Sequence, residues 1–180
     1  MFTRALITAL ITVALLPAQQ AAPRAQAELI FRDKKKVTVD YGRPTRAKRP
    51  VFGNVVRYGR IWSPGAGQAT LFSTDTPLQI DEVTVPPGHY SLYVLPTDTD
   101  WILIISQKNG QPGLPYPKGY DFARVKMKKQ ELTRPVEQLT FSFDYHGPTG
   151  GAMKLMWDRT EAWVDFKEKE NVPADEGDAS

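Results

Sequence analysis

Short runs of alternating apolar and polar residues constrain the fold of this chain more than any other feature. The run Val37–Tyr41 has Val, Val and Tyr at every second position, and Leu139–Tyr145 repeats the pattern with Leu, Phe, Phe and Tyr. A period of two is that of a β-strand with one buried face. The 15 Pro and 13 Gly residues are scattered between such runs, which favours many short strands and turns over a helical bundle.

Two further runs, Tyr90–Leu95 and Trp101–Ile105, are apolar at nearly every position. Apolar residues on both faces predict central strands that are covered on both sides. The loop between residues 107 and 119 is rich in Gly and Pro, and a loop of that length is usually functional or mobile. The sequence therefore predicts an all-β fold, an antiparallel β-sandwich of jelly-roll type with about nine short strands and little helix.

The N-terminus has the features of a secretory signal peptide. An apolar run of about a dozen residues follows one Arg and ends before Pro17, and Ala25-Gln26-Ala27 matches an A-x-A cleavage site. The run is shorter than the roughly 20 residues of a transmembrane helix. We therefore expect residues 1–27 to be removed without leaving a membrane anchor, residues 28–36 to be an exposed lead-in, residues 37–166 to form the single domain, and residues 167–180 to be an acidic disordered tail.

The distribution of charge and the lack of cysteine limit the classes of function. From Arg32 to Arg60 there are ten Lys or Arg and two Asp, a balance of +8, whereas Glu161–Ser180 has seven acids and two Lys, a balance of −5. Such asymmetry often indicates nucleic acid binding, but export makes a glycan or an anionic polymer of the cell envelope the better partner. Alternatively, the two charged regions only solvate the protein or face each other. Zero Cys excludes disulfides, a thiol nucleophile and thiolate metal ligands.

No catalytic or metal-binding motif stands out in the sequence. The two histidines, His89 and His146, are not in H-x-H or H-x-x-x-H spacing, so we predict neither a metal site nor a cofactor. A G-x-S-x-G nucleophile elbow is absent. A carboxylate-dependent hydrolase acting on a periplasmic substrate, with Asp40 and His89 as its groups, remains the alternative.

Residues 37–70 concentrate arginine, glycine and aromatic residues, and they contain the best candidates for a binding site. Aromatic faces and guanidinium groups together suit the recognition of sugars and anions. The same aromatic residues could instead pack in the core and hold an irregular loop. The predicted ligand-binding residues are Asp40, Tyr41, Arg43, Tyr58, Arg60, Trp62 and His89.

Several motifs in order resemble a bacterial family of exported proteins known as domain of unknown function 2911. They are DYGRP at residues 40–44, YGRIW at 58–62 followed by G-A-x-x-A-T at 65–70, PPGHYSLYVLP at 86–96, Trp101, ARV at 123–125, VEQLTFSF at 136–143, and Trp157 with Thr160. The resemblance covers residues 36–166. It implies an exported all-β domain and no assigned activity.

The resemblance also identifies three departures from the family pattern. Members usually carry W-R-x-G-A-N-E-A-T, and this chain has Ser63, Gly67 and Gln68 where the pattern has Arg, Asn and Glu. If those polar residues form a site in the family, this protein has lost a charged part of it. We therefore predict that the arginines nearby serve as structural or binding anchors and that the glycine segment carries no chemistry.

Overall fold

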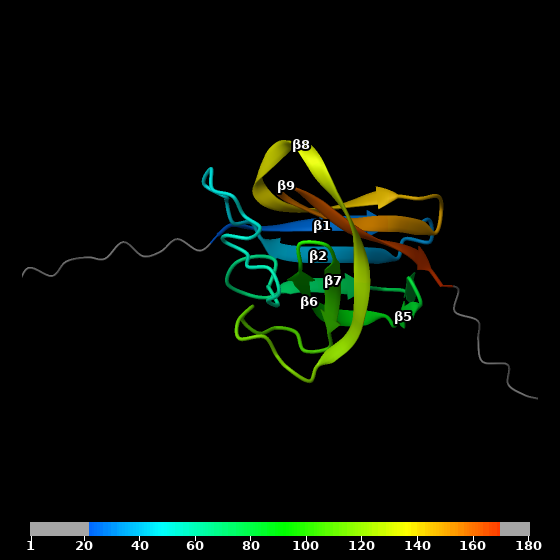
Figure 1. Ribbon diagram of the computed structural model, residues 1–180. Helices are drawn as coiled ribbons and strands as arrows, with labels where there is room; N and C mark the ends of the chain where they lie inside the picture. The colour runs from blue at the N-terminus through cyan, green and yellow to red at the C-terminus, as the bar shows by residue number, and fades with distance from the viewer. Residues whose placement is uncertain (1–21, 170–180) are drawn as a thin grey trace, which may run out of the picture.

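Nine antiparallel strands make up the regular structure in the computed structural model, which describes residues 22–169 (Figure 1). No helix occurs in this part of the chain, so none there is long and apolar enough to cross a membrane. The strands are β1 Arg24–Ile30, β2 Lys36–Gly42, β3 Thr70–Thr74, β4 Leu78–Ile80, β5 Val83–Val85, β6 Gly88–Pro96, β7 Trp101–Ser106, β8 Asp121–Tyr145 and β9 Gly150–Glu168.

The strands form one sheet in the order β1-β2-β3-β6-β7-β8-β9-β4-β5. Every neighbouring pair is antiparallel. The predicted all-β antiparallel fold is thus confirmed. The nine strands join in a single hydrogen-bonded order, and the finer jelly-roll arrangement stays a prediction.

Two of the strands are much longer than the short strands that we predicted. Strand β8 has 25 residues and β9 has 19. The first part of β8 pairs with β7 up to Met127, and the remainder pairs with β9 from Lys128 to Tyr145. Strand β9 also pairs with β4 at its end. The long β8–β9 hairpin therefore crosses the molecule and contacts both ends of the sheet (Figure 1).

A break within β9 folds this hairpin. The buried apolar residues are Met153, Leu155 and Trp157 before the break, and Ala162, Val164 and Phe166 after it. The buried set changes from odd to even positions, so an irregular residue must lie between the two halves. Asp158 is that residue: its φ is 53°, and the β8–β9 register shifts where it faces Val136. Asp tolerates this left-handed conformation better than most residues.

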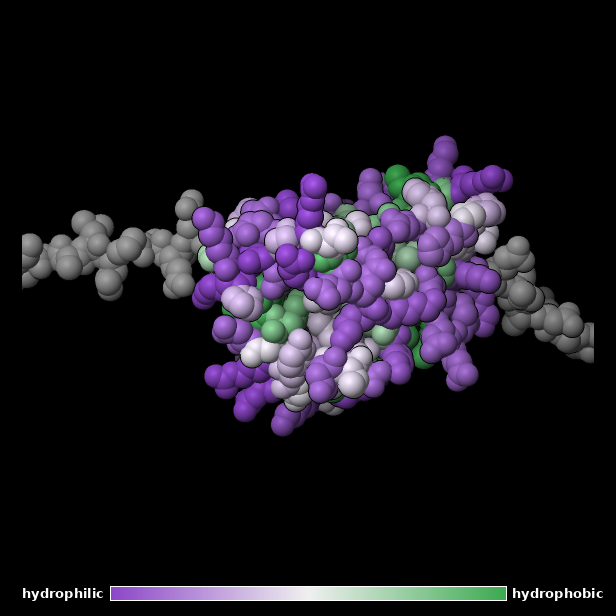
Figure 2. Space-filling view, turned by 45° about the horizontal axis from the view of Figure 1, so that its top comes forward, coloured by the Kyte–Doolittle hydropathy of each residue, from purple (hydrophilic) through white to green (hydrophobic). Residues whose placement is uncertain are grey.

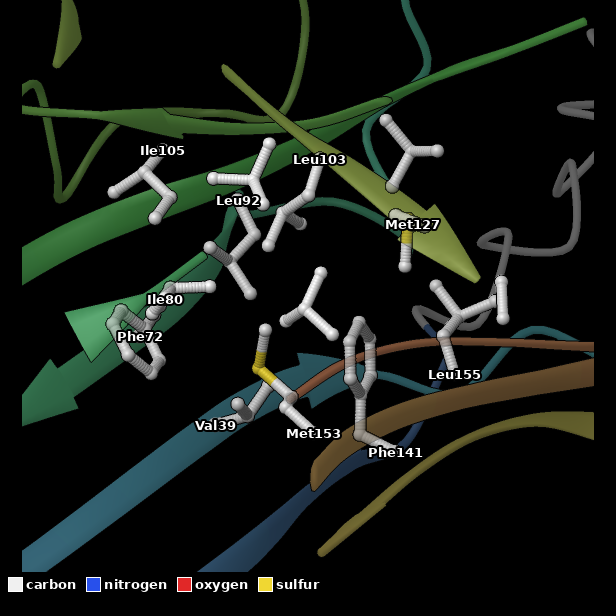
Figure 3. Packing of buried hydrophobic residues seen from close by; sticks show 14 of the residues in the cluster. Val39, Phe72, Ile80, Leu92, Leu103, Ile105, Met127, Phe141, Met153 and Leu155 are labelled. Atoms are coloured by element: carbon white, nitrogen blue, oxygen red, sulfur yellow. The ribbon is translucent and has the colours of Figure 1, made fainter. Parts of the chain in front are cut away.

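The core lies between the inner faces of the strands and is almost wholly apolar. Figure 3 shows Leu92, Leu103 and Ile105 on one side, facing Phe141 and Met153 on the other. These five residues come from β6, β7, β8 and β9, and each is at most 4% exposed. Burial of an apolar side chain of this size contributes about 2 kcal/mol. The core therefore supports the fold without disulfides, in accord with the absence of Cys.

The structure corrects the predicted domain boundaries at both ends. The lead-in expected at residues 28–36 was wrong in part, because Leu29 and Phe31 are buried and β1 extends to Ile30. Strand β9 continues to Glu168, two residues into the predicted tail. Residues 1–21, which hold most of the predicted signal peptide, and residues 170–180 lie outside the described residues.

Strand β1 bears directly on the predicted cleavage after Ala27. Its residues Arg24 to Ala27 pair with Gly42 to Val39 of β2, and Arg24 Nε donates a 2.6 Å hydrogen bond to Asp40. Removal of residues 1–27 would leave only Glu28, Leu29 and Ile30 of this strand.

We predict that a chain beginning at Glu28 is less stable than one beginning at Ala22. The loss of four ladder positions costs about 2 kcal/mol, or about 5 °C in Tm. Thermal unfolding followed by circular dichroism measures it. An Arg24→Ala variant of the longer chain is the control, because an exposed ion pair contributes only about 0.5 kcal/mol. Equal Tm values for the two chain lengths would contradict the prediction.

Candidate functional site

The segment from Arg43 to Ala69 is irregular, yet it is tied to the sheet along its whole length. At its start, the backbone N–H of Arg46 donates to Glu137 of β8 (2.9 Å). Asp158, at the break of β9, accepts from the side chain of Arg46 (2.5 Å) and from the backbone N–H of Val51 (3.1 Å). One carboxylate therefore fixes the first half of the segment to the long hairpin.

Four aromatic residues hold the second half of the segment. Trp62 stacks on Trp157 of β9 with ring centroids 5.9 Å apart and an angle of 18° between the planes. Phe52 meets Trp62, Trp157 and Trp101 edge-on at 5.8, 6.5 and 4.6 Å. The backbone of Trp62 also exchanges two hydrogen bonds with Val94 of β6. Trp62 is therefore first a structural residue that anchors the loop.

The DYGRP and G-A-x-x-A-T motifs lie against each other. A Cβ atom at Gly42 would come within 2.6 Å of the backbone oxygen and 2.7 Å of the backbone nitrogen of Ala66. Thr70, which is fully buried, donates its hydroxyl to the carbonyl of Pro64. The end of β2 and the glycine segment thus pack backbone against backbone, and only glycine fits at position 42.

The loop between β7 and β8 covers the outer face of β6. Gln111 donates to the hydroxyl of Tyr93, which is 0% exposed, and Tyr116 meets the Tyr93 ring edge-on at 5.0 Å. Burial and a hydrogen bond to Asp121 raise the pKa of Tyr116 to about 12, so at neutral pH its hydroxyl is protonated and donates to that carboxylate. This loop, predicted to be functional or mobile, is held by side-chain hydrogen bonds.

An open pocket of about 440 Å³ lies between these two loops. Arg57, Arg60 and Trp62 line one part of it, and Leu114 lines another. The remaining lining residues are small or apolar: Val55, Val56, Ile61, Ser63, Gly65, Ala66, Gly67 and Gly113. No acidic residue lines the pocket, so its charged groups are the two guanidinium groups. An anion with a flat or apolar part is the ligand that such a lining suits.

The two arginines of the pocket are exposed and keep their charge uncompensated. Neither Arg57 nor Arg60 forms an ion pair with any residue between 22 and 169. Figure 2 shows a largely hydrophilic surface with hydrophobic residues only in separate patches. Val55 and Leu114, which are 44% and 68% exposed, are among the exposed apolar residues, and both border this pocket.

Only two of the seven predicted site residues line this pocket, namely Arg60 and Trp62. Tyr58 lines a neighbouring pocket instead. Tyr41 is 3% exposed and packs edge-on against Phe141. Arg43 is half-buried, and its side chain lies 3.4 Å from both the carbonyl of Leu139 and the hydroxyl of Thr140. Tyr41 and Arg43 therefore belong to the framework that carries the loop.

Asp40 and His89, the groups of the hydrolase alternative, are separated by β3. Asp40 is paired with Arg24 of β1. His89 Nδ1 lies 2.8 Å from Ser73 Oγ, opposite it on β3. The backbones of the two strands are therefore about 10 Å apart, and the two side chains are engaged by different partners. Neither residue lines any of the pockets described in this section.

Analysis of the sequence missed Arg57 and Leu114 as pocket residues. Arg57 directly precedes Tyr58 and is three residues before Arg60, so the basic character of this turn was visible in the sequence. Leu114 lies about 50 residues later in the chain, and no local pattern links it to residues 57–62. Its place depends on the contact of Gly113 with Gly67, whose backbone atoms are joined by a 2.8 Å hydrogen bond.

A second cluster of charged side chains lies between the two halves of β9. Glu161 is 6% exposed and is the only buried charged residue among residues 22–169. It accepts from Gln130 (2.8 Å) and pairs with Lys154 (3.1 Å), which also pairs with Asp144 (3.0 Å). Burial alone would lower the pKa of Lys154, but its hydrogen bonds to Asp144 and Glu161 outweigh burial and raise it. These charges satisfy one another, so the cluster joins the halves of β9.

Comparison with known protein families matches residues 22–166 to the family described as "Protein of unknown function (DUF2911)". The chain belongs to this family. The resemblance found in the sequence motifs is thus confirmed. No curated protein and no solved structure gives a match.

Two of the three departures from the family pattern lie at the pocket itself. Ser63 and Gly67 both line it, where the family pattern has Arg and Asn. The third, Gln68, lies beside Arg24, whose Nη1 is 3.5 Å from the Gln68 carbonyl. Ser and Gly are smaller and less polar than the Arg and Asn of the pattern that the resemblance implies, so these two positions fill less of the pocket and add less polarity to it. No group of three or more His, Asp or Glu that could hold a metal occurs among residues 22–169.

We predict that Asp158→Ala lowers the free energy of unfolding by about 3 kcal/mol. It removes the partner of Arg46, the acceptor of the Val51 N–H and a side chain suited to positive φ. Asp158→Asn keeps an acceptor and tolerates the same φ, so it should lose about half as much. Urea unfolding measures both, with exposed Asp98→Ala as the control. Equal stability of all three variants would refute the role of Asp158.

Two glycine substitutions test the packing of the glycine segment. Gly42→Ala should destabilise by about 1–3 kcal/mol, because the new methyl group meets backbone atoms of Ala66. Gly113→Ala meets the Ser63 Oγ atom at 2.5 Å, the end of a side chain. Adding Ser63→Ala should therefore restore stability to Gly113→Ala and leave Gly42→Ala unchanged in thermal unfolding. Rescue of both variants, or of neither, would contradict this packing.

Proposed function

We propose that this protein is an exported, non-catalytic binding module that recognises an acidic saccharide in the pocket of Arg57, Arg60 and Trp62. Export is supported by the N-terminal sequence, whose apolar run after a single Arg is typical of a signal peptide. The observation that carries the proposal is a pair of exposed guanidinium groups, without acidic neighbours in the lining, beside an indole ring and glycine backbone.

The chemistry of this lining supports an acidic sugar in particular. A guanidinium group binds a carboxylate through two parallel hydrogen bonds, and each charge-assisted bond is stronger than a neutral one. The exposed part of an aromatic ring packs well against the C–H face of a sugar. Gly67, where an added Cβ atom would meet nothing within 4 Å, lets a ligand approach the backbone closely. The backbone bonds of Trp62 to Val94 keep the pocket formed before binding, which reduces its entropic cost.

The arrangement gives less support to the hydrolase alternative. Its carboxylate, Asp40, is engaged by Arg24, and the pocket has no acid that could serve as a general acid or base. General acid–base catalysis needs such a group within hydrogen-bonding reach of the substrate. We therefore retain binding as the proposal.

Digalacturonic acid, measured by isothermal titration calorimetry, tests this function. Binding should weaken about tenfold in Arg57→Ala and in Arg60→Ala, since each change removes a charge-assisted contact. Binding should also weaken as salt is raised. Arg134→Ala, an exposed arginine outside the pocket lining, is the matched control and should bind normally. Trp62→Ala is unsuitable because it removes the stack on Trp157.

Uncharged maltose serves as the ligand control and should not bind. Absence of digalacturonate binding to the wild-type protein would sink the proposal. Equal binding by wild type and the Arg57→Ala/Arg60→Ala double variant would also sink it, because the ligand would then be bound elsewhere.

A further inference from the structure

Tyr58 lines a second pocket. It has a volume of about 410 Å³, and its lining includes Tyr58, Lys129, Glu131 and Arg159. Arg57 lines the first pocket and the next residue in the chain lines the second, so one turn of the chain contributes to both linings. A ligand that extends beyond the first pocket would meet the second one next.

Tyr58 is held in place at this boundary while its ring stays accessible. The N–H of Gly59 donates to the carbonyl of Pro96 (2.8 Å), which fixes the turn to the end of β6. The ring lies against Gly53, where an added Cβ atom would be 3.2 Å from it. Tyr58 is nonetheless 45% exposed. A fixed, exposed aromatic ring in the lining of the second pocket is a surface on which a ring of a ligand can stack.

The basic residues of the second pocket are oriented by uncharged groups. Lys129 Nζ donates to the carbonyl of Asp98 (2.9 Å), and Arg159 Nη1 donates to the carbonyl of Thr133 (3.0 Å). Carbonyl oxygens fix the position of these cations, and neither cation forms an ion pair among residues 22–169, although, beside the hydrogen bond from Lys126, the charge of Lys129 helps to lower the pKa of Asp100. Glu131 is the one acidic residue in the lining.

Taken together, the two pockets are strongly basic. Their lining residues include Arg57, Arg60, Lys129 and Arg159 against Glu131, a balance of +3 (4 − 1). A single acidic sugar uses the two cations of the first pocket only. Lys129 and Arg159 are neutralised only by a ligand that carries a further anionic group, one or more sugar units away from the first.

We infer that the ligand is an acidic polysaccharide chain, whose neighbouring units occupy both pockets and cross Tyr58 between them. This inference rests on the proposed function, because the first pocket supplies the primary site. The second pocket adds affinity as an extension of the same chain, since its occupation follows binding in the first pocket intramolecularly.

Galacturonic acid oligomers of two to eight units test this inference with the full protein. The affinity of the wild-type protein should rise with chain length and then level off once both pockets are filled. The Lys129→Gln/Arg159→Gln variant should bind digalacturonate as the wild type does, but should lose about tenfold in affinity for the octamer. Tyr58→Ala should show the same split between short and long oligomers. Lys118→Gln, an exposed lysine outside both pockets, is the control.

The outcomes separate this inference from the proposed function. Length-independent affinity that still needs Arg57 and Arg60 would overturn the two-pocket inference and leave the proposed function standing. Equal losses for the dimer and the octamer in Lys129→Gln/Arg159→Gln would also overturn it, because the second pocket would not be a separate extension. Absence of binding at every length would overturn both. Thermal unfolding of each variant shows whether a loss of binding reflects a loss of folding.

Discussion

The carboxylate of Asp158 is the contact on which the candidate site depends. The backbone of Asp158 has a positive φ, and this breaks β9 into two halves. The break brings Lys154 of the first half into contact with Glu161 of the second half. The Asp158 side chain binds Arg46 and the N–H of Val51, and the residue before it, Trp157, stacks on Trp62. A single bulge therefore shapes the long hairpin and fixes the loop that supplies most of the first pocket and Tyr58 of the second, which is a common role of bulges beside functional sites.

Period-two alternation was enough to predict the fold class, because most core strands bury one face and therefore place an apolar residue at every second position. Alternation did not by itself identify strand β1 or the break within β9. Strand β1 also alternates, with Ala25, Ala27 and Leu29 on its more buried side, but it was missed because residues 25–27 match a signal cleavage site and were assigned to the signal peptide. The break at Asp158 left a readable trace in the phase change between Trp157 and Ala162. A turn and a bulge both interrupt alternation, so this trace alone does not distinguish one broken strand from two separate strands.

The site was predictable only in part for a similar reason. Residue type identified the right segment, and Arg60 and Trp62 do border the pocket. Other predicted site residues do not border it because their side chains point elsewhere. On β2, Tyr41 points into the core, whereas Asp40 points outward and pairs with Arg24. The opposite wall comes from Leu114 in a loop whose contact with Gly67 is a backbone hydrogen bond. Backbone contacts between distant loops have no compositional signal, so sequence patterns cannot identify them.

The Lys154–Glu161 cluster and the basic residues around Tyr58 differ in how their charges are paired. This difference supports a structural role for the cluster and a binding role for the basic residues. Between the halves of β9, Glu161 is buried and has Gln130 and Lys154 as partners, as the cost of burying a lone charge requires. Around Tyr58, the cations are exposed and form no ion pair among residues 22–169, and Lys129 and Arg159 donate to carbonyl oxygens. Mutual repulsion among them lowers stability slightly. An anionic ligand would remove that repulsion, and this gain requires the charges to remain unpaired in the free protein.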